Sequence, residues 1–402
     1  MVLLEKFEIV FPLPTQEDGL ERYVVPSLLP DAQPPNYSEL WGNIDDQSYQ
    51  LGRIYQFKFL PLGFFSRLFV RILHLPKMKA HAYWQNGIIL SFDEERALIR
   101  YNPTEYKLTM NVRGEKESPC RGQLLRLLIE NVETIIEGWY ETDVDIYVPC
   151  VHCVEIGSYS PYLFTLEECI HQVTTGTGQP FVWCRGLRRV RIDALAPDIS
   201  FTDMRTKRVD FKDIQLSSVI GLGAFGKVYS GKWNDQLVAI KILENQKKEQ
   251  FSELEEPDAE EYKRFNEFQR EVWIMSCIKH QNLVQLKCIC ANPPAMIMEL
   301  LPLGDLYHML YPKPPSNLGE DDLAQYKWSV TQQNHHLLVT NRELRLRIAL
   351  DIAKGMKYLH SLSPPIIHRD LRSPNIFVSS HTLAFPPPFI YLFFLFHFMI
   401  KR

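Results

Sequence analysis

Residues 220–229 read Ile220-Gly221-Leu222-Gly223-Ala224-Phe225-Gly226-Lys227-Val228-Tyr229, and the stretch Val238-Ala239-Ile240-Lys241 follows shortly after. A Gly-x-Gly-x-x-Gly pattern alone is weak evidence, because dinucleotide-binding folds use the same letters where a helix begins. In this chain the residues after the last glycine, 227–233, read as a strand, and Lys241 closes a second strand. The pattern therefore predicts a β-hairpin that covers a ligand.

The glycines indicate the chemistry of that ligand. Residues without a Cβ atom let backbone amides approach phosphate oxygens closely. The amine of Lys241 can then neutralise negative charge on the phosphates. We therefore expect a nucleotide phosphate site beneath the hairpin.

A second cluster lies further along the chain. It reads Ile367-His368-Arg369-Asp370-Leu371-Arg372-Ser373-Pro374-Asn375-Ile376 and follows an amphipathic helix expected at about residues 343–360. Together and in this order, the two clusters resemble the protein kinases. That resemblance implies that Asp370 accepts the proton of the substrate hydroxyl, that Asn375 ligates magnesium and that Arg372 contacts the transferred phosphate.

Kinases also hold their nucleotide-binding lysine with a carboxylate from a following helix. An apolar stripe predicts that helix, with the members Phe265, Phe268, Val272, Met275 and Ile278. By resemblance Glu271 is the lysine's partner, and Glu267 is the competing candidate. Between strand and helix, residues 244–264 are expected to form a solvated insertion.

The resemblance implies the rest of the ATP site. Met298 stands at the gatekeeper position, and Glu299 and Leu301 follow as the hinge that offers backbone hydrogen bonds to adenine. The full set of expected ATP contacts is Ile220, Gly221, Gly223, Ala224, Gly226, Val228, Ala239, Lys241, Met298, Glu299 and Leu301. Ser373-Pro374 is typical of tyrosine-kinase-like serine/threonine kinases. Because Arg372 stands where most of these carry lysine, a tyrosine preference stays open beside the favoured serine/threonine preference.

The first third of the chain has another character. Helical periodicity over 123–139 and an Asn86-Gly87 hairpin signal predict an α+β domain. The segments that stand out are Leu4-Glu5-Lys6-Phe7, Tyr23-Val24-Val25-Pro26-Ser27-Leu28-Leu29-Pro30, Pro61-Leu62-Gly63-Phe64-Phe65-Ser66-Arg67-Leu68 and Tyr83-Trp84-Gln85-Asn86-Gly87-Ile88. They resemble the C-terminal part of the COR domain of the Roco family, which implies dimerisation. No Gly-x4-Gly-Lys-Ser/Thr loop occurs, so GTP binding is not assigned to this chain.

Cysteines cluster between these two regions. Cys150 and Cys153 form a Cys-x-x-Cys pair, and Cys169, His171 and Cys184 follow. Four cysteines could enclose a structural zinc ion, although Cys169 and Cys184 do not form a matching second pair. The alternative is that these cysteines are merely buried or reduced thiols.

Composition limits the remaining possibilities. With 44 Lys+Arg against 48 Asp+Glu in mixed order, no nucleic-acid-binding surface is indicated. The N-terminal residues lack the pattern of a secretion signal, and 8 cysteines without such a signal favour free thiols or a metal. We expect a cytoplasmic protein without a membrane span.

The kinase pattern stops after Val378. No Asp-Phe-Gly or Ala-Pro-Glu triplet follows, and an apolar run over 389–400 is shorter than the roughly 20 residues of a membrane-spanning helix. We expect an α+β multidomain chain with a COR-like domain at 1–145, a cysteine-bearing connector at 146–205, an incomplete kinase domain at 206–378 and an unexplained tail at 379–402. The predicted function is ATP- and magnesium-dependent phosphorylation of protein hydroxyls, with this chain inactive as given. The alternative is a pseudokinase or COR dimerisation scaffold that binds ATP without transfer.

Overall fold

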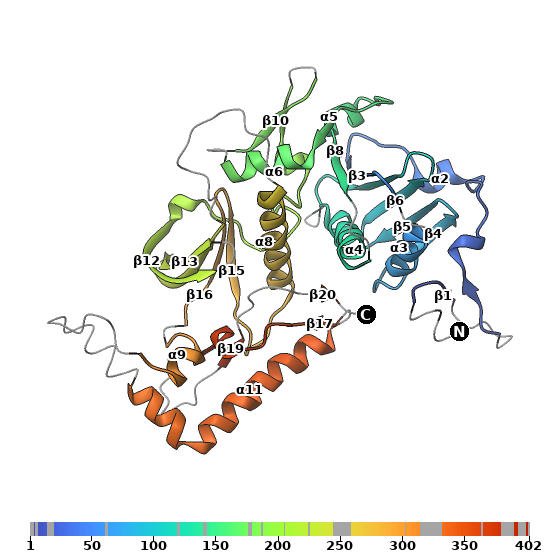
Figure 1. The fold of residues 1–402 in the computed structure, drawn as a ribbon. Coiled ribbons are helices and arrows are strands. Elements are labelled where there is room, and N and C mark those ends of the chain that lie inside the picture. The colour runs from blue at the N-terminus through green and yellow to red at the C-terminus, as the bar shows by residue number, and fades with distance from the viewer. Residues whose placement is uncertain are drawn as a thin grey trace. The chain divides into compact units, whose positions relative to one another are not determined.

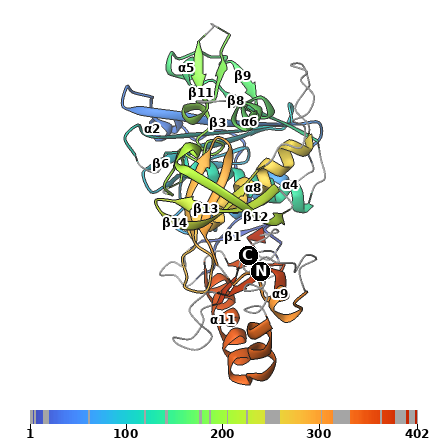
Figure 2. The ribbon, with the colours of Figure 1, turned by 90° about the vertical axis from the view of Figure 1, so that its left-hand side faces the viewer.

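The chain forms two compact units and passes from one to the other between Arg205 and Thr206 (Figure 1, with a side view in Figure 2). The structure is a computed structural model. It describes residues 4, 7–13, 20–60, 63–118, 121–139, 143–175, 179–185, 188–204, 206–223, 226–243, 259–301, 303–313, 332–362, 365–378, 390–392 and 399–400. Each unit is α+β, as the sequence predicts.

A seven-stranded antiparallel sheet organises the first unit, with the strand order β4-β5-β6-β7-β3-β8-β9. Its strands are β3 (Ser48–Phe57), β4 (Lys79–Trp84), β5 (Gly87–Phe92), β6 (Glu95–Asn102), β7 (Lys107–Glu115), β8 (Val144–Pro149) and β9 (Leu163–Thr165). The last two strands come from the segment expected to be a connector. That segment therefore extends the sheet of the COR-like region.

Two helices cover this sheet, α3 (Phe64–Leu73) and α4 (Gln123–Trp139) (Figure 1). They pack on each other, and α4 also contacts β3, β6 and β7. The bounds of α4 coincide with the periodic stretch, and its apolar face is buried at Leu124, Leu128, Val132 and Ile135. Periodicity predicts this helix well because one apolar face is matched to one sheet.

Shorter elements complete the first unit. They are β1 (Phe11–Pro12), β2 (Tyr23–Val24), η1 (Pro26–Leu28), α2 (Tyr37–Trp41), α5 (Val151–Glu155), α6 (Leu166–Thr175), β10 (Phe181–Trp183), β11 (Arg189–Arg191) and α7 (Ile192–Leu195). Among the described strands, β10 and β11 pair with each other and with no third strand.

The β4–β5 hairpin is confirmed, but its loop lies one residue earlier than the Asn86-Gly87 signal places it. Trp84 pairs with Gly87, so the loop residues are Gln85 and Asn86. Gly87 is required for a different reason, because a Cβ atom there would lie 2.0 Å from the ring of Trp84. The glycine makes room for a buried indole rather than for a positive φ.

The second unit begins with a five-stranded antiparallel sheet of order β12-β13-β14-β16-β15. Its strands are β12 (Ile214–Gly223), β13 (Gly226–Trp233), β14 (Gln236–Ile242), β15 (Leu286–Ala291) and β16 (Pro294–Glu299), preceded by η2 (Phe211–Asp213). Asn234 and Asp235 both have positive φ, which suits the tight turn between β13 and β14. The predicted hairpin of the glycine-rich stretch is thus confirmed, and the reading in which the glycines open a helix is excluded.

Helices and short strands follow this sheet. They are α8 (Ala259–Cys277), α9 (Leu306–Leu310), α11 (Arg342–Ser361), β17 (Ile366–Ile367), η3 (Ser373–Asn375), β18 (Ile376–Val378), β19 (Ile390–Leu392) and β20 (Met399–Ile400). Strand β19 pairs with β18, and β20 pairs with β17. The other residues of the predicted tail, and most of the predicted insertion at 244–264, lie outside the described residues.

None of the helices in the described ranges combines the length and the apolar character needed to cross a membrane.

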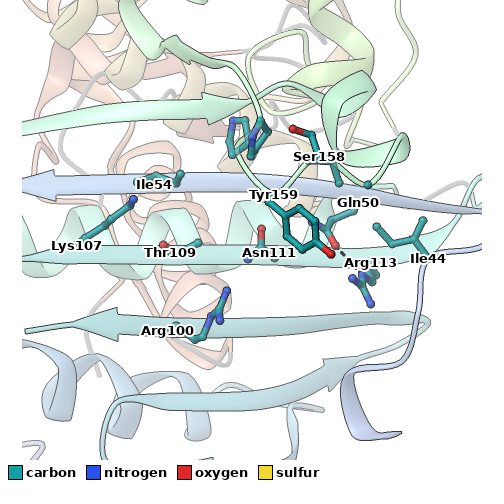
Figure 3. Close-up of a pocket in the computed structure, with 14 residues that line it drawn as sticks. Ile44, Gln50, Ile54, Arg100, Lys107, Thr109, Asn111, Arg113, Ser158 and Tyr159 are labelled. Carbon is teal, nitrogen blue, oxygen red and sulfur yellow. Dashed lines mark hydrogen bonds between the residues drawn. The ribbon is translucent and has the colours of Figure 1, made fainter. Parts of the chain in front are cut away.

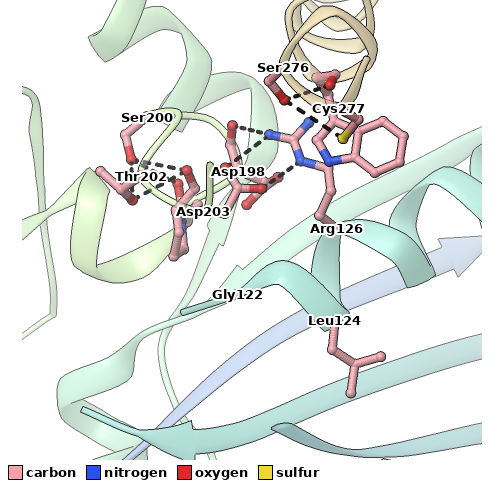
Figure 4. A network of polar contacts seen from close by, with 12 residues as sticks. Gly122, Leu124, Arg126, Asp198, Ser200, Thr202, Asp203, Ser276 and Cys277 are labelled. Carbon is pink, nitrogen blue, oxygen red and sulfur yellow. Dashed lines mark hydrogen bonds and ion pairs between the residues drawn. The ribbon is translucent and has the colours of Figure 1, made fainter. Parts of the chain in front are cut away.

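Two buried ion pairs fasten the end of the first unit to its sheet and helix (Figure 4). Arg126 of α4 donates from Nε to Asp203 Oδ2 at 2.7 Å and from a terminal nitrogen to the carbonyl of Asp198, also at 2.7 Å. Arg53 of β3 donates to both carboxylate oxygens of Asp198, at 2.8 and 2.7 Å. Both guanidinium groups are 1% exposed, so each depends on its carboxylate for compensation of lost hydration.

We expect Asp203→Asn to lower the free energy of unfolding of the first unit by roughly 3–5 kcal/mol, because the substitution leaves the charge of Arg126 buried without its counter-charge. Hydrogen–deuterium exchange of α4 measures this loss. The matched control is Asp143→Asn, which breaks the exposed pair with Lys58, where the side chains are 79% and 71% exposed, and should change exchange little. Equal protection of α4 in both variants would contradict the assignment.

Candidate active site

The glycine-rich stretch forms the β12–β13 hairpin. Gly221 faces Val228 across the pair, and Gly223 faces Gly226, whose φ is 148°. A Cβ atom on Gly221 would meet only Val228, at 3.9 Å, so one side of this strand is open at the glycine. Ala224, an expected ATP contact, lies outside the described residues. At Gly221 the hairpin therefore presents backbone rather than a side chain.

Lys241 occupies the centre of the sheet and is held by helix α8. Its strand neighbours are Val228 on one side and Met296 on the other. Its amine donates to Glu271 Oε2 at 2.6 Å, and the two side chains are 0% and 4% exposed. The structure thus pairs the lysine with Glu271, not with the alternative candidate Glu267.

Burial works against both charges of this pair. Desolvation lowers the pKa of Lys241 and raises the pKa of Glu271, and the attraction between the two groups opposes each shift. Glu271 Oε1 has no hydrogen-bond partner among the described residues. The pair is therefore a costly buried arrangement, of the kind found more often at functional sites than in a purely structural core.

The apolar positions of α8 explain how Glu271 reaches this place. Its predicted stripe is buried throughout, with Phe265, Phe268, Val272, Met275 and Ile278 between 0% and 4% exposed. Glu271 lies three residues after Phe268 and four before Met275, on the same face of the helix as both, so packing of the stripe directs the carboxylate inward.

Strand β16 leads to the expected hinge. Met298 is fully buried and pairs with Ala239, so both lie in the sheet interior. The backbone N–H of Glu299 donates to the carbonyl of Gln285 at 3.2 Å, and the carbonyl of Leu301 accepts from Gly304 at 3.2 Å. These two backbone groups already have partners within the protein.

The second cluster forms a tight loop around Asp370. The backbone N–H of Asp370 donates to the carbonyl of His368 at 2.8 Å, and Arg369 between them has a φ of 59°. Asn375 donates from Nδ2 to Asp370 Oδ2 at 2.8 Å and to the Asp370 carbonyl at 2.9 Å. The Nε of Arg372 lies 3.0 Å from Asp370 Oδ1. The structure brings the three residues predicted for the catalytic loop into direct contact.

Asn375 also offers a candidate cation ligand. Its side chain is 0% exposed, and its Oδ1 has no hydrogen-bond partner among the described residues. Amide oxygens are among the donors that Mg²⁺ accepts, so the residues present fit Asn375 Oδ1 as one ligand of a magnesium ion.

One apolar core connects the two halves of this site. It contains Ile274 from α8 and Ile278 directly after that helix, Leu344, Ile348 and Leu359 from α11, and Ile376 and Val378 from β18 directly after the catalytic loop. The helix that holds Glu271 and the loop that holds Asp370 consequently pack within the same cluster.

The cysteines form a smaller group than the sequence predicts. The thiol sulfurs of Cys150, Cys153 and Cys184 lie within 4.8 Å of one another. Cys169 is outside this group, so the predicted four-cysteine site is corrected to three. Its thiol is buried near Arg53 and Asp198, and desolvation raises its pKa. Sequence spacing could not show this, because the position of Cys169 on α6 depends on how that helix packs.

A cavity of about 410 Å³ in the first unit carries no sequence motif (Figure 3). Three basic residues, Arg100, Lys107 and Arg113, contribute to its lining. Arg113 donates to the side-chain oxygen of Gln50 at 2.7 Å and to the carbonyl of Gly42 at 2.7 Å, so its charge is partly compensated. The lining residues are spread from position 44 to position 161, so no local sequence pattern predicts the cavity.

Comparison with known proteins agrees with this architecture. Residues 48–198 match the family model for the C-terminal of Roc, COR-B domain, and residues 214–384 match the model for protein tyrosine and serine/threonine kinases. Three proteins of Dictyostelium discoideum are similar over most of the chain. They are a probable serine/threonine-protein kinase, pats1 (37% identical over 94% of this chain), the cyclic GMP-binding protein C (30% over 90%) and a probable serine/threonine-protein kinase, roco7 (28% over 95%).

These relatives are much longer proteins. The chain spans 11% of the first and 14% of each of the other two. Within that span the order of domains is a COR-B domain followed by a protein kinase domain. The chain belongs to the Roco family of serine/threonine-protein kinases.

Proposed function

We propose that this chain supplies the nucleotide site and the catalytic loop of an ATP- and magnesium-dependent kinase that phosphorylates serine or threonine hydroxyls of proteins. The observation that carries the proposal is the buried contact of 2.6 Å between Lys241 and Glu271. Burying a lysine beside a carboxylate costs hydration free energy, and the arrangement gains a purpose when the amine also neutralises phosphate oxygens.

The other groups have distinct roles in this proposal. The glycine-rich hairpin covers the phosphates with backbone amides, and adenine lies against Met298 and Ala239. Because the N–H of Glu299 and the carbonyl of Leu301 already have partners, adenine would use the carbonyl of Glu299 and the N–H of Leu301. The nucleotide is thus held from both ends before any transfer.

Asp370 is the base that takes the proton of the substrate hydroxyl. Its Oδ2 is fixed by Asn375 and its Oδ1 by Arg372, so the carboxylate is oriented before the substrate arrives. Arg372 is 61% exposed and can reach a phosphate oxygen as charge shifts toward the acceptor. Magnesium held at Asn375 Oδ1 would supply charge neutralisation on the phosphates.

The alternative function is nucleotide binding without transfer, as in a pseudokinase or a COR-based scaffold. It is favoured by the lack of an Asp-Phe-Gly triplet after Asn375 in this sequence. Sequencing the transcript beyond Val378 separates the two, because an Asp-Phe-Gly and an Ala-Pro-Glu triplet there support the enzyme. Homodimerisation through the COR-B domain and a cytoplasmic location remain proposals that rest on the family alone.

We expect Lys241→Met to weaken the binding of ATP with magnesium at least about tenfold, which corresponds to about 1.4 kcal/mol, because the phosphates lose their cation. Isothermal titration calorimetry on the chain measures this change. Glu271→Gln should weaken binding in the same direction, since the lysine loses the group that positions it. Lys232→Met is the control, because this lysine lies exposed on β13. If both site variants bind ATP with magnesium as tightly as the unsubstituted chain, the assignment of this site to ATP is wrong.

We expect Asp370→Asn to reduce phosphoryl transfer by about 10²–10⁴-fold while ATP affinity stays the same, because only proton abstraction is lost. The measurement is radiolabel transfer to peptides bearing serine, threonine or tyrosine, using the longest natural protein that contains this segment. Glu343→Gln, exposed on α11 where it pairs with Arg347, should leave the rate unchanged. Transfer by Asp370→Asn at the rate of the unsubstituted protein would exclude this residue as the base.

A further inference from the structure

The three-cysteine cluster joins two segments that are distant in the sequence. Cys150 directly follows strand β8, Cys153 lies on the short helix α5 that comes next, and Cys184 comes directly after β10. The sulfurs of Cys153 and Cys184, 31 residues apart, lie 3.5 Å from each other. The cluster belongs to the first unit and has no part in the kinase site.

The separation of the sulfurs suits a metal ion. With a zinc–sulfur distance of about 2.3 Å and tetrahedral geometry, two thiolates on one ion lie roughly 3.8 Å apart. All three sulfurs are within 4.8 Å of one another, so small rotations of the side chains suffice to enclose an ion. A disulfide, in contrast, needs about 2.05 Å between sulfurs and can use only two of the three.

A metal ion at this cluster would stabilise the β10–β11 hairpin. Strands β10 and β11 have three residues each and pair only with each other, with Val182 and Val190 as their buried contacts. A two-stranded hairpin of this size is marginally stable on its own. Cys184 leads into the turn of this hairpin, where its N–H donates to the carbonyl of Arg188 at 2.9 Å.

The cluster is also accessible on one side. Cys150 and Cys184 are buried, whereas Cys153 is partly exposed. Among the residues that the structure describes, these three are the only histidine, cysteine or acidic side chains in the group.

We propose that Cys150, Cys153 and Cys184 bind one zinc ion through three thiolates, with water in the fourth position, and that this ion fastens the β10–β11 hairpin to the edge of the main sheet. Each thiol releases its proton to solvent on binding, so affinity falls as the pH is lowered. Because one coordination position is open to solvent, the ion exchanges with added chelators and with other metal ions.

The test begins with metal analysis of the full chain, purified under reducing conditions and incubated with zinc. We expect about one bound zinc per chain, lost in each of Cys150→Ser, Cys153→Ser and Cys184→Ser. Two matched controls should keep the metal. Cys169→Ser changes a buried cysteine of the same unit, and Cys277→Ser changes an exposed cysteine of the other unit. No zinc above background in the unsubstituted chain overturns the proposal.

A cysteine variant could lose zinc simply because it unfolds, so two further measurements test the site without relying on those variants. Replacing zinc by cobalt gives thiolate charge-transfer absorption whose intensity reports the number of bound sulfurs, and three are expected. Four bound sulfurs would overturn the ligand set. So would loss of the band in Cys120→Ser, which changes a cysteine outside the described residues. Hydrogen exchange at 181–191 should accelerate when a chelator is added, while exchange of α4 stays constant. A Cys153–Cys184 disulfide found by mass spectrometry in the native protein would likewise exclude the zinc site.

Discussion

The kinase unit depends on one contact, the buried ion pair between Lys241 in the sheet and Glu271 on α8. The pair crosses from a strand to a helix, so both elements must be in place before either charge is compensated. Strand pairing fixes the position of Lys241, and burial of the apolar stripe of α8 fixes the position of Glu271. Sheet register and helix register are therefore constrained together by a single salt bridge.

Buried charge also organises the first unit, but there it is purely structural. Arg53 and Arg126 carry their guanidinium groups into the interior and bind Asp198 and Asp203 from the end of the same domain. No ligand role is needed to explain these pairs, because Asp198 and Asp203 are each matched by an arginine of the fold. Comparison of the two units shows that burial of a charged group does not by itself distinguish a catalytic residue from a structural ion pair.

Much of this architecture could be predicted from the sequence. Helix α4, the stripe of α8 and the glycine-rich hairpin follow from local periodicity and composition. Where a feature depends on packing at a distance, prediction failed. The Gly87 signal gave the right hairpin with the wrong loop, since the indole of Trp84 was not visible to a local rule. Cys169 was grouped with the wrong partners for the same reason, and the buried Arg126–Asp203 pair had no signal at all.

The shared core around α8 has a mechanical consequence. Ile274 lies on the same helix as Glu271 and Ile278 follows directly after its end, and both pack in one cluster with Ile376 and Val378 of the strand after Asn375. Because a helix moves as a rigid body, a rotation of α8 that withdraws the Glu271 carboxylate from Lys241 also displaces the apolar side chains that pack next to the catalytic loop. Any partner that pushes on α8 thus acts on the phosphate end and the acceptor end of the reaction at once.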